Sequence, residues 1–117
     1  MNSLIHLPFL IGMAFLFVHE LDAIQHHEWR FFFSLLPLSD ITAYRIFTTA
    51  HIPLFVLIMW NAHILWFQIG FDVFFTIHAG LHWILRNHPK IKFNNGFSQL
   101  WIFGAALFGL IHLGLLR

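Results

Sequence analysis

Histidines and carboxylates recur at helical spacing near the end of the first apolar stretch of the sequence. His19, Asp22 and His26 are separated by three and four residues, so a helix would present all three on one face, with Glu20 beside them. Ionisable groups in such an apolar segment are costly unless they pair with one another or serve a site. This face therefore predicts a polar site rather than a surface in contact with lipid.

A second group of histidines has the spacing of a metal-binding helix. His78 and His82 are four residues apart, so their imidazoles can reach the same ion from one helix face. His51 lies in a further apolar stretch. At a rise of about 1.5 Å per residue, His19, His51 and His78 fall at a similar depth in their helices. Three helices are therefore expected to bring polar groups together.

The donor atoms of these residues indicate which cofactor to expect. Nitrogen ligands with carboxylates and without sulfur suit zinc or non-haem iron, and the chain has no cysteine. We therefore predict a divalent metal ion, zinc or iron. The predicted metal ligands are His19, Asp22, His26, His51, His78 and His82. Glu20 and Asp22 are the predicted catalytic carboxylates, as general bases, while Glu20 and His51 are alternatively groups that orient the ligands.

The leading hypothesis is a metal-dependent membrane enzyme that acts on a lipid or another apolar substrate near the cytoplasmic leaflet. Zinc would activate a water molecule for hydrolysis, whereas iron would activate dioxygen for oxidation. The sequence His78-x-x-x-His82 resembles one histidine box of the membrane desaturases and hydroxylases, whose other boxes are absent here. The choice between a hydrolase and an oxidase or hydroxylase stays open.

Three alternatives use the same residues differently. His19, Glu20 and Asp22 can form a hydrogen-bonded network that only holds the helices together. A b-type haem or pigment can be ligated by His51 with His78 or His19, from facing helices. The protein can also be an accessory subunit, or an ion or proton carrier that works as an oligomer.

The composition of the chain is that of a membrane protein. Hydrophobic residues make up 59% of the 117 residues and charged residues only 9%, against about 45–50% and 25% in soluble domains. Such a chain is too short to bury its apolar side chains in a soluble core. The net charge of +1 gives no indication of nucleic-acid binding.

Four apolar stretches predict four helices, each long enough to cross the hydrocarbon layer. They cover residues 3–27, 40–67, 71–87 and 96–116. Turn and capping signals separate them: Pro37 with Ser39, Gly70 with Asp72, and residues 87–96. The fold class is therefore all-α, an integral membrane four-helix bundle that forms a single domain over residues 1–117.

Cationic residues gather around the first and third connections between these helices. They are Arg30, Arg45, Arg86, Lys90 and Lys92, and the other side has only the amino terminus and Arg117. The positive-inside rule then places both connections in the cytoplasm and both termini on the non-cytoplasmic side. We expect a multi-pass protein of a bacterial inner membrane, with membrane lipid, a second copy or a larger membrane complex as partners.

Several further residues have weaker signals. Glu28 and Arg30 are expected at the level of the lipid headgroups. His6, His63 and His112 would lie near the outer side, either at the interface or as a second cluster. Gly104, Gly109 and Gly114 would permit close helix contact.

Two motifs resemble those of known families. The sequence contains HELDA at residues 19–23 and HEWR at residues 27–30. In these it resembles a family of small bacterial four-span membrane proteins with a domain of unknown function, and the resemblance covers most of the chain. More distantly it is similar to the His-x-x-Glu-Glu membrane proteins, which have a histidine and carboxylates late in the first span and a histidine in the third. Here Asp22 is followed by Ala23, where that pattern has adjacent glutamates.

Overall fold

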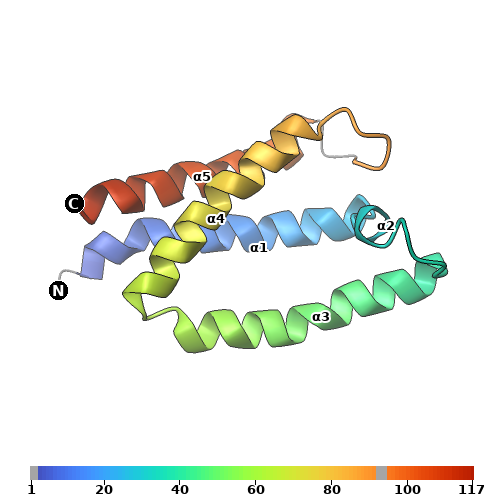
Figure 1. Ribbon diagram of the computed structural model, residues 1–117. Coiled ribbons are helices and arrows are strands. Elements are labelled where there is room, and N and C mark those ends of the chain that lie inside the picture. Colours follow the sequence, from blue (N-terminus) through green and yellow to red (C-terminus); the bar gives the residue numbers. More distant parts are fainter. Residues whose placement is uncertain (1–2, 92–94) are drawn as a thin grey trace.

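The computed structural model describes residues 3–91 and 95–117, and every regular element in this part of the chain is a helix (Figure 1). The elements, in order, are η1 (Ser3–His6), α1 (Leu7–Gln25), α2 (Trp29–Phe32), α3 (Asp40–Asn61), α4 (Leu65–Ile84) and α5 (Gly96–Leu115). The predicted all-α class is confirmed. Lys92, one of the predicted cytoplasmic cations, lies outside the described residues.

Three segments are long and apolar enough to cross a membrane: Ser3–Gln25, Asp40–Asn61 and Gly96–Leu115. Helix α4 has a comparable length, but Gln68, Asp72, His78 and His82 make it more polar. Large apolar side chains are widely exposed on the bundle, as Trp60 and Trp66 illustrate, and lipid is the solvent that suits such a surface. A four-span bundle, and the side on which its ends lie, stay predictions.

Helix α5 packs against both α1 and α4, and these three helices form the core of the molecule (Figure 1). Small residues allow the close approach. A Cβ atom added at Gly104 would collide with the ring of Phe15 on α1, and one at Gly109 would meet the backbone of Asp72 on α4 at 3.2 Å. Gly104 and Gly109 therefore serve the predicted helix contacts, whereas Gly114 faces open space.

Helix α3 contributes little to this core, in which Ile58 is its buried member. Only Ala43 and Ile58 are buried along its 22 residues. Its connections to α1 include an edge-on contact between the rings of Phe17 and Phe55, whose centroids are 5.2 Å apart. The amino and carboxyl ends of the chain lie at the same end of the molecule (Figure 1).

The boundary predicted between the second and third helices is wrong. Helix α3 ends at Asn61 rather than Phe67, and α4 begins at Leu65 rather than Phe71. The chain turns at residues 62–64, where Ile64 adopts an extended conformation (φ −87°, ψ 120°) and caps α4. Gly70 and Asp72, which were predicted to mark the turn between these helices, lie inside α4. Oδ2 of Asp72 pairs with His112 across the bundle, so Asp72 does not cap a helix.

The other predicted boundaries differ by smaller amounts. The first helix ends at Gln25 rather than His27, and the last helix, α5, ends at Leu115. The side chain of Ser39 accepts a hydrogen bond from the backbone N–H of Thr42, which confirms the predicted N-cap of α3.

Candidate metal centre

Three histidines and one glutamate converge between α1 and α4. One donor atom from each of His19, Glu28, His78 and His82 lies within 4.8 Å of the other three. The ring centroid of His19 lies 4.8 Å from that of His78 and 5.1 Å from that of His82. His19 and Glu28 are buried, and the two α4 histidines are largely so. Residues from three parts of the sequence therefore form one enclosed polar cluster.

The spacing of the donor atoms fits a divalent metal ion. Adjacent ligands of a tetrahedral zinc ion lie about 3.3 Å apart, because each is about 2.0–2.1 Å from the metal. The Nε2 atoms of His78 and His82 are 3.2 Å apart, and Oε1 of Glu28 is 3.9 Å from Nε2 of His82. Three imidazoles with one carboxylate suit zinc, iron or manganese.

The turn after α1 directs Glu28 towards the histidines. The backbone N–H of Glu28 donates to the carbonyl oxygen of Ala23 at 3.1 Å, and that of His27 donates to Ile24 at 3.3 Å. These two hydrogen bonds make a Schellman C-cap. The residue at its left-handed position is His27, with φ 59°, where glycine is usual. The chain thereby reverses, and the side chain of Glu28 lies against α4.

Burial changes the acidity of this carboxylate. Removal from water raises the pKa of Glu28 from 4.5 to about 8, and the nearby charge of Glu20 adds to the effect. Glu28 is therefore largely protonated at neutral pH when no cation is close. A bound cation would compensate the carboxylate charge and displace the proton.

The structure brings together three of the six predicted ligands, His19, His78 and His82. Asp22 and His26 instead pair with each other, with Nδ1 of His26 3.2 Å from Oδ1 of Asp22. Neither residue belongs to the group of His19, Glu28, His78 and His82, and their roles as ligands stay predictions.

The sixth predicted ligand, His51, has both ring nitrogens engaged. Nδ1 donates to the carbonyl oxygen of Phe47 at 2.8 Å, and Nε2 lies 2.8 Å from Oε2 of Glu20. Glu20 and His51 were considered either as ligands or as groups that orient the ligands. Their contact with each other fits a pair that lies beside the cluster.

Sequence reasoning missed Glu28 as a member of the cluster. It was expected at the level of the lipid headgroups, but its side chain is buried. The available signal was the unbroken run of His26, His27 and Glu28 at the end of an apolar helix. This run would have identified Glu28 as a member of the cluster only if the chain were known to reverse direction at His27.

A comparison with known protein families covers almost the whole chain. The model of a family of unknown function, DUF6713, matches residues 5–117. The chain belongs to this family. No curated protein and no solved structure matches it significantly. The expected relation to a family of unknown function is confirmed, and the more distant resemblance to the His-x-x-Glu-Glu proteins stays a prediction.

Two apolar grooves of this DUF6713 protein run beside the candidate metal centre. One lies between α1 and α3, has a volume of about 530 Å³, and is lined by Phe17, Leu21 and Ile52 among others. The other, about 510 Å³, is bounded by α1, α3 and α4. Glu20 lines both grooves, and Phe74 lines the second and stacks on His78 with 5.3 Å between ring centroids. The second groove therefore reaches the edge of the histidine cluster, and the first shares Glu20 with it.

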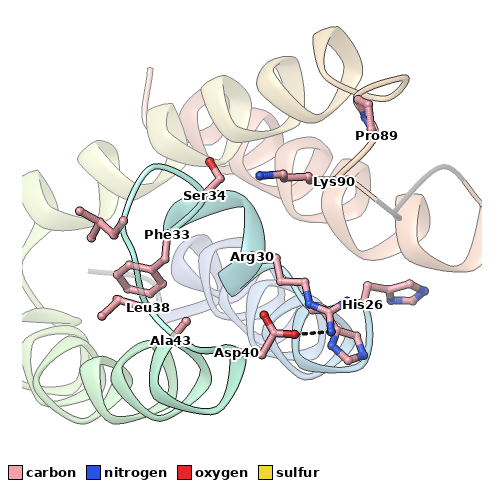
Figure 2. Close-up of a pocket in the computed structure, with 11 residues that line it drawn as sticks. His26, Arg30, Phe33, Ser34, Leu38, Asp40, Ala43, Pro89 and Lys90 are labelled. Atoms are coloured by element: carbon pink, nitrogen blue, oxygen red, sulfur yellow. Dashed lines mark hydrogen bonds and ion pairs between the residues drawn. The ribbon is translucent and has the colours of Figure 1, made fainter.

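A more polar pocket of about 390 Å³ opens where α1, α2, α3 and the segment after α4 meet (Figure 2). Arg30 donates to Oδ2 of Asp40 across it at 2.9 Å, as the dashed line in Figure 2 marks. His26 and Lys90 also line this pocket. The pair of Arg30 and Asp40 links α2 to the start of α3.

Proposed function

We propose that this DUF6713 protein is a divalent-metal-dependent membrane protein whose centre is formed by His19, Glu28, His78 and His82. The observation that carries the proposal is the convergence of three imidazoles and one carboxylate within 4.8 Å. A buried carboxylate inside an apolar bundle needs a compensating charge, and an ion among neutral imidazoles supplies it. Zinc or iron is the proposed ion.

The proposed activity is catalysis on a lipid or another apolar substrate. A bound zinc ion would supply a Lewis acid and an activated water, and iron would supply oxidation chemistry. The two apolar grooves support this substrate class, because both lead to Glu20 and the second also reaches Phe74, which stacks on His78. Hydrolysis and oxidation are both compatible with this donor set.

Glu20 is the proposed general base, since it lines both grooves next to the centre. Its contact of 2.8 Å with Nε2 of His51 holds the carboxyl group in place. The catalytic role predicted for Asp22 is less well supported, because Asp22 turns towards His26. Glu20→Gln should therefore keep the metal and lose the reaction.

The alternative of a bis-histidine haem fits this geometry less well. A macrocycle between two axial imidazoles needs ring centroids about 6 Å apart and a wide flat slot between them. The centroids of His19 and His78 are only 4.8 Å apart, and His51 is bound to Glu20.

The topology and location are part of the same proposal. We propose that α4 is the fourth span, shielded from lipid on its polar face by α1 and α5, which gives a four-helix bundle in a bacterial inner membrane. Both termini would lie on the non-cytoplasmic side. The exposed apolar faces of α3 leave room for lipid, for a second copy or for a larger complex.

Metal analysis of tag-free, detergent-purified protein tests the proposal. We expect about one zinc or iron ion bound to the wild-type centre and its loss in both His19→Ala and His78→Ala. His88→Ala, which changes an exposed histidine outside the cluster, is the matched control and should keep the metal. Retention of the ion in both cluster variants would overturn the proposed centre, and so would its absence from folded wild-type protein.

A further inference from the structure

A second polar cluster lies within the bundle, away from the metal centre. Asp72 of α4 and His112 of α5 are both fully buried, and Nδ1 of His112 is 2.6 Å from Oδ2 of Asp72. His6 packs beside them, with its ring centroid 5.7 Å from that of His112. His6 and His19 are 13 residues apart along η1 and α1, which corresponds to roughly 20 Å. The two clusters are therefore separate.

Hydrogen bonds determine which ring nitrogens of these histidines are available. Nε2 of Gln68 donates to the carbonyl oxygen of Ala62 at 2.8 Å, so the oxygen of the same amide faces Nδ1 of His6, also at 2.8 Å. An amide oxygen only accepts, so Nδ1 of His6 carries the hydrogen. Nδ1 of His112 likewise donates to the carboxylate of Asp72. In both neutral rings, Nε2 is left with a free lone pair.

Within the described part of the chain, this arrangement leaves one buried polar atom unsatisfied on each of Asp72 and His112. Nε2 of His112 and Oδ1 of Asp72 are buried without a hydrogen-bond partner among the described residues. With Nδ1 of His112 as the donor, the pair would hold the charge of the Asp72 carboxylate in a fully buried place, which is costly. One positive charge at Nε2 of His112 would remove both costs.

We propose that His6 and His112 bind a second transition-metal ion through their Nε2 atoms. Metal-binding histidines donate their other ring N–H to a carboxylate or carbonyl oxygen, which is what Asp72 and Gln68 accept here. A metal about 2.1 Å from two imidazole nitrogens holds their ring centroids about 5–6 Å apart, in agreement with the observed 5.7 Å. The ion belongs to the class that prefers imidazole, zinc or copper.

With two protein ligands, this second ion is held less tightly than the ion at the first centre and exchanges more readily. His6 is only half-buried, so the ion has a path from the surface, whereas His112 forms the inner end of the site. The ring of Phe9, 5.8 Å from that of His112, forms an apolar wall beside it. The inference does not depend on the proposed enzyme activity.

The test is a zinc titration of tag-free, chelator-treated full-length protein in detergent, with bound zinc counted by mass spectrometry. Wild-type protein should bind two ions of unequal affinity. His6→Ala, which leaves the buried Asp72 and His112 pair intact, should lose the weaker ion and keep the tighter one. His19→Ala should do the reverse. His63→Ala, which changes an exposed histidine in the turn before α4, should bind both ions as wild type does.

Gln68→Ala provides a second variant, because it removes the group that orients His6 and leaves both histidines in place. We expect it to weaken the second ion by about 10–100-fold, the usual effect of removing such a partner. A single ion in wild-type protein that His6→Ala keeps would overturn the proposal. Two ions in His6→Ala would also overturn it. Failure of the first centre alone would appear as one wild-type ion that His6→Ala loses and His19→Ala keeps.

Discussion

Oε1 of Glu28 lies 3.9 Å from Nε2 of His82, although Glu28 follows α1 and His82 belongs to the last turn of α4. The contact links two helices whose direct packing is otherwise limited, since both pack mainly on α5. It also brings the one carboxylate of the cluster to the histidines. Glu28 is therefore the residue on which charge balance at the centre depends.

Glu28 should release a proton when the metal binds. Its pKa of about 8 means that the carboxyl group is largely protonated at pH 7, and a cation displaces that proton. Adding zinc to chelator-treated protein in weak buffer at pH 7 should release about one proton more from wild type than from Glu28→Gln, as measured with a pH indicator. Asp40→Asn, which removes an exposed carboxylate, should release as many as wild type. Equal release by wild type and Glu28→Gln would contradict this assignment.

The same carboxyl group should make the metal-free protein less stable as the pH rises. The folded state keeps the proton up to about pH 8, whereas the unfolded chain loses it near 4.5, so the folded state binds more protons between these values. The free energy of unfolding should therefore fall across that window, by at most about 1.4 kcal/mol per pH unit. Thermal unfolding in detergent at pH 5, 6, 7 and 8 measures this.

Glu28→Gln cannot lose a proton, so its stability should change less over this range. With zinc bound, the trend should reverse, because protons compete with the metal for the ligand. The metal-free wild type and Glu28→Gln should therefore differ in how their stability changes from pH 5 to 8. The same pH dependence in both proteins would show that Glu28 is ionised in the folded state.

The three histidines of the centre could be predicted because helical periodicity alone places them. His78 and His82 share a face of α4 whatever surrounds it, and His19 lies at a matching depth of α1. The role of Glu28 could not be predicted in this way. It depends on the left-handed conformation of His27, which is rare for residues other than glycine and is stabilised by the two capping hydrogen bonds.

The number and class of the long helices could also be predicted, but not the boundary near Gly70. Hydropathy identifies apolar segments, whereas a polar residue within one is either a break or a partner for another helix. Asp72 is a partner for His112, which is 40 residues later in the sequence. Local patterns contain no information about such a contact, so the position of the turn was misplaced by several residues.

The conformation of His27 gives a prediction about stability. A side chain in the left-handed region costs about 1–2 kcal/mol relative to glycine, and β-branched side chains tolerate it least. His27→Gly should therefore retain the metal, with unchanged or slightly higher stability. His27→Val should unfold at a lower temperature and bind zinc more weakly, because the turn that directs Glu28 is strained. Thermal unfolding and zinc titration of both variants measure these effects. Stronger metal loss in His27→Gly than in His27→Val would mean that the imidazole, rather than the backbone, matters.

Two glycines of α5 offer a matched pair for testing how closely α1 and α5 approach. A methyl group at Gly104 would collide with the ring of Phe15, whereas one at Gly114 would meet nothing within 4 Å. Gly104→Ala should therefore destabilise the protein by about 1–3 kcal/mol, the usual cost of overpacking. Gly114→Ala should be neutral or stabilising by up to about 1 kcal/mol, because alanine is the better helix former. Thermal unfolding of both variants in one detergent gives the comparison. Equal changes in stability for Gly104→Ala and Gly114→Ala would mean that α5 does not approach Phe15 of α1 so closely.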